Sequence, residues 1–186
     1  MLLDVCSLAI PDVKLIRTDR RSDDRGYFCE TFQRSAFGEQ GILCDFLQDN
    51  QSGSDRIGTV RGLHFQRPPF AQTKLIRVLS GAIFDVAVDL RRSSPSFGKH
   101  VVVELDSERG EQLLVPSGFA HGFCTLQPRT VVFYKVDQVY APSHDGGVYW
   151  ADPALAIGWP VAVSDAHLSP KDRALPMFDQ LAPVFE

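Results

Sequence analysis

Short runs of apolar residues, separated by clusters of turn residues, dominate the chain from residue 57 onward. These runs predict strands at 57–65, 74–79, 83–90, 100–105, 112–115, 119–126 and 131–140. The separating segments, such as RPPFAQ and RRSSPSFGK, are rich in Gly, Pro, Ser and charged residues. Strands this short and this closely spaced are typical of a sandwich or a barrel and argue against βαβ units.

The strand expected at 83–90 has two faces of different character. One face carries Phe84, Val86, Val88 and Leu90. The other carries Ile83, Asp85, Ala87 and Asp89, so that two carboxylates stand four residues apart. Because side chains alternate along a strand with a period of two, we expect the first face to lie in the core. The second face would then present the two carboxylates.

The residues before this region predict two further strands and a helix. We expect strands at 10–17 and 26–32, on either side of a polar turn at 19–25. Residues 33–41 are expected to form a short helix, with Gly41 just past its end. Glycine is favoured at that position because it adopts a positive φ without a Cβ clash.

The strand pattern is lost after residue 141. Five prolines punctuate this region: Pro153, Pro160, Pro170, Pro176 and Pro183. We therefore expect 141–186 to be a tail that wraps the body, with at most short helical turns. No Ser/Gly-rich linker, charge block or repeat divides the chain, which predicts a single domain spanning 1–186.

The composition is that of an ordinary soluble globular protein, with 44% hydrophobic and 23% charged residues. A formal net charge of −4 and scattered arginines argue against a nucleic-acid partner. The N-terminus has no basic n-region, and no apolar run is long enough to span a membrane, so no membrane association is expected. The four cysteines are far apart and form no CxxC pair, which indicates free thiols in a reducing compartment. We expect a cytoplasmic protein.

The segment RGLHFQ at 61–66 places an arginine, a histidine and a glutamine among apolar residues of an expected strand. His64 can move a proton near neutral pH, and Arg61 can hold an anionic group, although an isolated strand histidine is more often structural. Strict alternation puts these two side chains on opposite faces. Both can line one pocket only if Gly62 bulges or twists the strand. A bulky residue at Gly62 is therefore expected to damage activity more than fold.

Gly110 and the segment PSGFAH at 116–121 match the second half of the cupin signature, G(x)5PxGxxH. In metal-binding cupins the first half supplies two more histidines and a glutamate. The corresponding region here offers only His64, which with His121 makes two histidines and no suitably spaced carboxylate. Two such ligands are too few for a zinc or iron site, so we expect no metal and no other cofactor.

Longer motifs run in order along most of the chain. They are DRGYFCETF at 24–32, QDNQS at 48–52, RGLHFQ at 61–66, DVAVDLR at 85–91, PSGFAHGF at 116–123 and LSPKD at 168–172. Together they resemble the dTDP-4-dehydrorhamnose 3,5-epimerase family, nucleotide-sugar epimerases of the cupin superfamily, from about residue 10 to about residue 176. The resemblance implies an all-β fold, a cupin or jelly-roll β-barrel with short peripheral helices.

The resemblance also implies a reaction and the residues that perform it. The substrate would be a dTDP-linked 4-keto-6-deoxyhexose, with protons removed and returned at C3 and C5 through an enolate. His64 matches the family's base, and Asp172 the acidic partner that orients it. Lys74 matches the lysine beside the C4 oxygen, and Tyr134 the acid on the opposite face. From the residues alone, Asp172 could instead cap a helical turn, Lys74 could be a solvated edge residue and Tyr134 could be a packed ring.

Ten further positions match the family's contacts to the nucleotide sugar. They are Arg25, Phe28, Glu30, Gln48, Asn50, Arg61, His121, Tyr140, Asp145 and Lys171. The cations suit pyrophosphate oxygens, and Phe28 and Tyr140 are candidates to stack on the pyrimidine. Because the N-terminal strand of the family is exchanged between subunits, the resemblance implies a homodimer.

Two positions depart from the family pattern. Phe65 stands where a tyrosine is common, and Asp145 where the family usually has a glutamate. These departures leave the acid–base set intact but bear on the preference for nucleotide and sugar. Three alternatives to double epimerisation are open. They are an epimerase acting at C3 or C5 only, a metal-dependent cupin, and a cupin that binds the sugar without catalysis.

Overall fold

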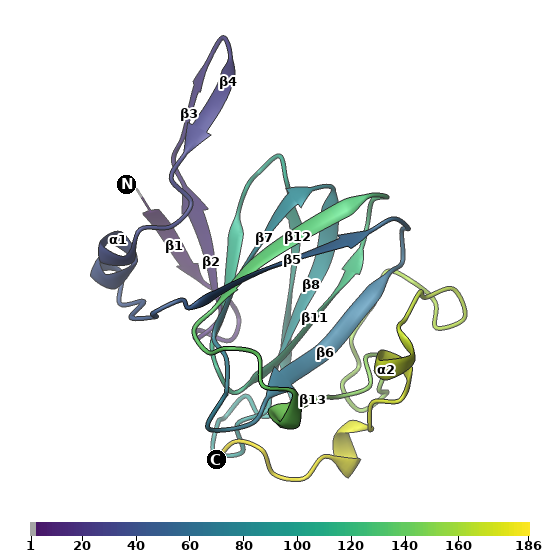
Figure 1. Cartoon of the computed structure of the whole chain (residues 1–186). Helices are drawn as coiled ribbons and strands as arrows, with labels where there is room; N and C mark the ends of the chain where they lie inside the picture. Colours follow the sequence, from purple (N-terminus) through teal and green to yellow (C-terminus); the bar gives the residue numbers. More distant parts are fainter. Residues whose placement is uncertain (1–2) are drawn as a thin grey trace.

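Two antiparallel sheets face each other in the computed structural model, which describes residues 3–186 (Figure 1). In spatial order, the first sheet comprises β1 (Leu3–Ser7), β2 (Lys14–Thr18), β10 (Gln112–Val115), β7 (Lys74–Ser80), β12 (Thr130–Val136) and β5 (Gln48–Ser54). The second comprises β13 (Asp145–Gly147), β6 (Val60–Gln66), β11 (Phe119–Thr125), β8 (Ala82–Asp89) and β9 (His100–Asp106). From β5 to β13 the chain passes repeatedly from one sheet to the other, as in a jelly roll.

The helices are short and peripheral. They are α1 (Arg34–Glu39), α2 (Pro170–Arg173) and two 3-10 turns, η1 (Pro142–His144) and η2 (Phe178–Gln180). The all-β cupin fold with short peripheral helices is therefore confirmed. Within residues 3–186, however, the two sheets are not hydrogen-bonded into a closed cylinder. No helix in this part of the chain is long and apolar enough to cross a membrane.

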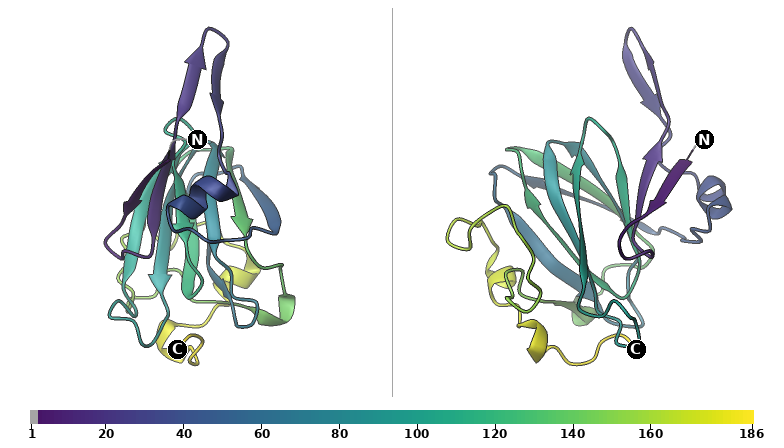
Figure 2. Two further views of the ribbon diagram at one scale, coloured as in Figure 1. Left: turned by 90° about the vertical axis from the view of Figure 1, so that its left-hand side faces the viewer. Right: turned by 180° about the vertical axis from the view of Figure 1, so that it is seen from behind.

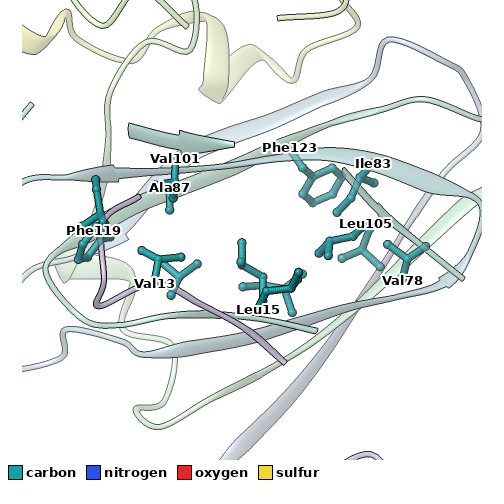
Figure 3. Packing of buried hydrophobic residues seen from close by; sticks show 14 residues of the cluster. Val13, Leu15, Val78, Ile83, Ala87, Val101, Leu105, Phe119 and Phe123 are labelled. Atoms are coloured by element: carbon teal, nitrogen blue, oxygen red, sulfur yellow. The ribbon is translucent and has the colours of Figure 1, made fainter. Parts of the chain in front are cut away.

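Apolar side chains from both sheets fill the space between them (Figure 3). Leu15 and Val78 come from the first sheet, and Leu105, Phe119 and Phe123 from the second. This core occupies one part of the space between the sheets. The polar site residues gather in another part, where the side chains come mainly from β5, β6 and β11, with one each from β7 and β12.

Both faces of β8 are buried, which corrects the expectation of one core face. Ile83 and Ala87 lie in the core between the sheets. Val86 and Val88 pack on the outer side, in a cluster with residues of the C-terminal tail. The reason is that β8 is flanked by β11 and β9 while the tail covers its outer face. The carboxylate-bearing face therefore points toward the core and not toward solvent.

The N-terminal region contains more strands than the sequence pattern predicted. β1 was not expected, and the polar turn expected at 19–25 contains β3 (Arg20–Asp23), which pairs with β4 (Gly26–Cys29). β5 was also missed, and the strand expected at 131–140 ends at Val136. The expected helix is confirmed, and Gly41 follows it with φ of +75°.

The C-terminal tail packs against the outer face of the second sheet. Trp150 is fully buried there, and its carbonyl accepts a hydrogen bond of 2.8 Å from Trp159 Nε1. Leu155 joins the cluster over Val86 and Val88. The path of this tail brings α2 against β6. It thereby delivers the residues of α2 to the site.

The β3–β4 hairpin projects away from the two sheets, as all three ribbon views show (Figures 1 and 2). Its residues Tyr27 and Phe28 are exposed, with Phe28 at 66%. The four cysteines are unpaired, so the expectation of free thiols is confirmed.

Candidate active site

Two adjoining cavities open between the sheets and share four residues. The larger has a volume of about 330 Å³ and is lined in part by Gln48, Asn50, Gln66, Tyr140 and Asp145. The smaller has a volume of about 240 Å³ and is lined in part by Ser52, Arg61, His121, Phe123 and Asp172. Both are lined by His64, Lys74, Tyr134 and Lys171. We treat the two cavities as two lobes of one cleft.

His64 forms a hydrogen bond with Asp172 at the junction of the lobes. Its Nε2 lies 2.5 Å from the Asp172 carboxylate, and 108 positions separate the two residues in the chain. The Asp172 side chain is buried and that of His64 is partly exposed. Since Nε2 is occupied, Nδ1 is the ring nitrogen that can accept a proton from a substrate.

The structure shows how Asp172 can serve both the helix and the imidazole. The side chain of Ser169 caps α2 by accepting a hydrogen bond of 3.1 Å from the Asp172 backbone N–H. The Asp172 carboxylate is left for His64. Burial is the largest single effect and would raise the pKa of this carboxyl, but the hydrogen bond and charge of His64, the hydrogen bond with Ser169 and the charge of Lys171 together outweigh it, so the pKa is lowered. Asp172 is therefore ionised at neutral pH and accepts the Nε2–H of His64.

A bulge at Gly62 brings Arg61 and His64 to the same cleft, as the sequence predicted. Arg61 pairs with Phe123 and His64 with His121, so two residues of β6 oppose the single residue Gly122 of β11. Gly62 adopts φ of +127°, in the region that favours glycine. Arg61 and His64 both line the smaller lobe.

We expect Gly62→Ala to damage the fold as well as the activity, which revises the expectation from sequence. A Cβ at Gly62 would lie 2.6 Å from Gly122 Cα and 2.8 Å from the His121 carbonyl oxygen. These are backbone atoms of β11 and cannot turn away. Together with the positive φ, this contact is expected to lower the free energy of unfolding by about 2–4 kcal/mol.

Urea unfolding of Gly62→Ala tests this expectation, with Gly53→Ala as the matched control. Gly53 also lies in a strand, but a Cβ there would meet no atom within 4 Å. The control should lose little stability. Equal stability of Gly62→Ala and the wild type would show that β11 can yield, and would contradict the argument.

Lys74 is buried beneath both lobes. Its Nζ donates a hydrogen bond of 3.4 Å to the backbone carbonyl of His64, which fixes the two side chains' relative positions on β7 and β6. Burial lowers the pKa of Lys74 to about 8, and the charges of Asp145 and Asp85 oppose this effect. The ammonium group is therefore mostly charged at neutral pH, but close to losing its proton.

Tyr134 faces the same cleft from β12, in the opposite sheet from His64. Burial raises the pKa of its hydroxyl, and the nearby charge of Arg61 opposes this increase. The phenol is therefore protonated at neutral pH and can act as a proton donor. His64 and Tyr134 come from the two facing sheets and border one space.

A second histidine–carboxylate pair lies in the smaller lobe. His121 Nε2 is 2.7 Å from the Asp85 carboxylate, and Asp85 is fully buried. The other carboxylate oxygen, Oδ2, has no hydrogen-bond partner among residues 3–186. Asp85 was not among the predicted site residues, because only the opposite face of β8 was expected to be core. A carboxylate on a strand that is buried on both faces would have been the signal.

The cationic and polar residues at the mouth of the cleft contact one another. Lys171 forms a short ion pair with Asp145, whose Oδ2 also accepts a hydrogen bond of 3.2 Å from the Tyr140 hydroxyl. Arg61 donates to Ser54 Oγ at 3.2 Å and to the Gly53 carbonyl at 2.8 Å. Asp145 thus retains a ligand-facing position with the shorter side chain.

Three of the predicted substrate-binding residues do not line the cleft of their own chain. Arg25 lies at the tip of the projecting hairpin, bound to Asp23, and Phe28 follows on β4. Glu30 lies just after that strand. The other predicted residues, catalytic and binding, line one or both lobes. Among residues 3–186, no three His, Cys, Asp or Glu side chains are grouped so that they could hold a metal ion.

The fold and the cleft define a cupin-type protein with acid–base side chains on two facing sheets. A sequence profile of the family described as dTDP-4-dehydrorhamnose 3,5-epimerase matches residues 7–180. The chain therefore belongs to the dTDP-4-dehydrorhamnose 3,5-epimerase family.

Individual relatives agree over almost the full length. The dTDP-4-dehydrorhamnose 3,5-epimerase of Sinorhizobium fredii is 51% identical over 180 residues, which cover 97% of this chain and 92% of the relative. A crystal structure of the Bacillus anthracis enzyme, with TDP and PPi bound, has a TM-score of 0.92 at 49% identity and covers 95% of this chain and 99% of the other. The Legionella pneumophila dTDP-6-deoxy-D-glucose-3,5-epimerase, in complex with dTDP-4-keto-L-rhamnose, has a TM-score of 0.92 at 40% identity. This match covers 97% of this chain and 95% of the other.

Proposed function

We propose that this protein inverts C3 and C5 of a dTDP-linked 4-keto-6-deoxyglucose, giving dTDP-4-dehydrorhamnose. The observation that carries the proposal is the placement of His64, with its carboxylate partner, and Tyr134 on opposite walls of one cleft with Lys74 between them in both lobes. Both carbons flank a ketone, so each inversion needs only a base, an acid on the opposite face and a cation at the oxygen.

Each residue has one role in this reaction. His64 Nδ1 takes the proton from the carbon next to the ketone, and Asp172 stabilises the imidazolium that forms. The electron pair moves to the C4 oxygen, where the Lys74 ammonium stabilises the enolate. Tyr134 then returns a proton to the opposite face of the carbon. His64 then releases its extra proton to solvent, and the Tyr134 phenolate takes one up. No electrons are gained or lost overall, so no redox step occurs.

The remaining residues of the cleft hold the nucleotide. Lys171, which lines both lobes, and Arg61, which lines the smaller lobe, supply positive charge for the two phosphates, and the amides of Gln48 and Asn50 line the larger lobe. His121 faces the sugar from the smaller lobe, held by Asp85. Tyr140 stands at the mouth and is 55% exposed, as a platform for the pyrimidine.

Incubation with the dTDP-4-keto-6-deoxyglucose substrate in D2O, followed by NMR, tests the reaction. Double epimerisation incorporates deuterium at both C3 and C5. Label at one carbon only would show an epimerase acting at a single site. Binding without label would show a sugar-binding cupin, and either result would contradict the proposal.

We further propose that the active form is a homodimer in which the β3–β4 hairpin of each subunit completes the cleft of the other. The support is that Arg25 and Phe28 lie on a projecting hairpin and outside their own cleft, with apolar rings exposed. An exposed aromatic pair on an unsupported hairpin is typical of an interface.

Subunit mixing distinguishes exchange from a hairpin that folds back. His64→Ala and Arg25→Ala should each be impaired alone. If the hairpin serves the neighbour, a mixed dimer contains one cleft with both changes and one cleft with neither. Co-refolding the two variants should then restore activity well above either parent. No restoration, with mixed dimers present by native mass spectrometry, would contradict the exchange.

A further inference from the structure

Residues 139–141 carry Tyr140 across the mouth of the cleft and lie outside the helices and strands. One buried side chain, that of Gln66, binds this segment on both sides of the tyrosine. Its Nε2 donates to the Val139 carbonyl at 3.1 Å, and its Oε1 accepts the Ala141 N–H at 2.7 Å. The same Nε2 donates to the Phe70 carbonyl at 2.8 Å. Both ends of the amide are therefore used.

A second amide holds the residue between these two bonds. Gln48 Oε1 accepts the Tyr140 N–H at 3.0 Å, and its Nε2 donates to Asn50 Oδ1 at 2.7 Å. Three consecutive residues are thus fixed by side chains of β6 and β5. The Tyr140 ring remains exposed, with its hydroxyl bound to Asp145. The backbone is ordered while the ring face stays available.

The position of Gln66 in β6 connects it with His64, the proposed base. It follows His64 by two positions, so the two side chains share a face of the strand, and both line the larger lobe. Gln66 is only 3% exposed, and its backbone pairs with Asp145 in β13. One strand therefore positions the proposed base and, through the amide, the segment that bears the aromatic ring.

A buried glutamine could also do no more than satisfy loop carbonyls. In that role, it would not matter which backbone groups the Gln66 amide binds. Here two of the three protein bonds flank Tyr140 directly, and a neighbouring amide takes the N–H between them. A stacking platform contributes most to binding when it is held in place before the ligand arrives, because less ordering is needed on binding.

We propose that Gln66 is a positioning residue that holds Tyr140 as the platform for the nucleobase, at a fixed distance from His64. The inference rests on the proposed function, in which Tyr140 stacks on the pyrimidine. It adds a residue whose amide is bonded to backbone groups at both ends, and that sets how the nucleotide end of the substrate is aligned with the reacting carbons.

A double-mutant cycle between Gln66 and Tyr140 tests the proposal, with calorimetric binding of dTDP as the measurement. Tyr140→Ala should weaken dTDP binding roughly tenfold, the scale of one base–aromatic stack, and Gln66→Met roughly fivefold. If Gln66 acts through the ring, Gln66→Met should change the affinity less than twofold when Tyr140 is already alanine. Binding of inorganic pyrophosphate, which has no base, should be unchanged by Gln66→Met.

Two controls keep the test independent of folding. Gln51→Met places the same side chain on an exposed position of β5 and should bind dTDP as the wild type does. Gln66→Glu keeps the acceptor for the Ala141 N–H but sets a carboxylate oxygen against the Val139 and Phe70 carbonyls, so it should weaken dTDP binding at least as much as Gln66→Met if the clamp is the cause.

Three results would overturn the proposal. They are equal losses of dTDP affinity from Gln66→Met in both backgrounds, a matching loss of pyrophosphate affinity, or no loss at all. Failure of wild-type protein to bind dTDP would instead overturn the proposed function, and with it this inference. dTDP binding that is insensitive to Tyr140→Ala would overturn the stacking platform and with it this inference, while the proposed epimerisation would stand.

Discussion

His64→Ala is expected to reduce deuterium incorporation at both C3 and C5 by roughly 10²–10⁴-fold, the usual contribution of a positioned general base. The reason is that His64 is the one imidazole at the junction of the two lobes whose Nδ1 is left to accept a proton. Its side chain is partly exposed, so its removal leaves the core intact. NMR in D2O measures both positions in one experiment, and thermal melting provides the control for folding.

Asp172→Asn separates orientation of the base from support of the helix. The asparagine keeps the backbone N–H that Ser169 accepts, so α2 should remain capped and the melting temperature nearly unchanged. It loses the negative charge that stabilises the imidazolium, so exchange should fall by roughly 10²-fold or more. Exchange equal to that of the wild type would remove the carboxylate from the mechanism. Retained exchange in His64→Ala would show that His64 is not the base.

The strands from β6 to β12 could be predicted because their apolar residues contrast with the intervening turn clusters. β5 could not, since its sequence QDNQSGS has no apolar face. One side of this edge strand lines the cleft with Gln48, Asn50 and Ser52, and the requirement for polar ligand contacts replaced the hydrophobic pattern. The short hairpin strand β3 was missed for a related reason, because its charged residues are solvent-exposed.

The sequence allowed most residues of the site to be predicted, but not which of them contact one another. The motif RGLHFQ pointed to His64, and alternation correctly required a distortion at Gly62. Long-range contacts leave no local signal, so the pairing of His64 with Asp172 came only from family resemblance. Asp85 was missed because period-two alternation identifies two faces of a strand without showing that both are covered. Gln66 stood in the same motif, but its role depends on where residues 139–141 pass.

Replacing Lys74 with methionine is expected to reduce exchange at both carbons by roughly 10²–10³-fold, the typical loss when one oxyanion contact is removed. Methionine preserves most of the volume at this buried position but supplies no charge to the enolate oxygen. The melting temperature should not fall, because the change removes the cost of burying an ammonium group. Loss of activity together with retained or increased stability is expected only if the charge serves catalysis.

The pH dependence of the wild-type enzyme gives a second measure of Lys74. Burial lowers its pKa to about 8, so the charged form is lost as the pH rises above that value. The kcat/KM, which reports the free enzyme, should therefore fall about tenfold per pH unit above about 8. Tyr134 does not cause this decrease, because burial raises the pKa of its hydroxyl above the usual value.

Stability should change in the opposite direction over the same range. Between about 8 and the ordinary lysine pKa of 10.5, the unfolded chain holds a proton at Lys74 that the folded chain has released. Through this group, stability therefore rises with pH where activity falls, so deprotonation of Lys74 does not lower activity by unfolding the protein. Lys74→Arg stays charged over this range, and although misplacement of its guanidinium should lower the rate, the decrease above pH 8 should disappear. If the decrease persists in Lys74→Arg, another group causes it and Lys74 is not the cation at the enolate.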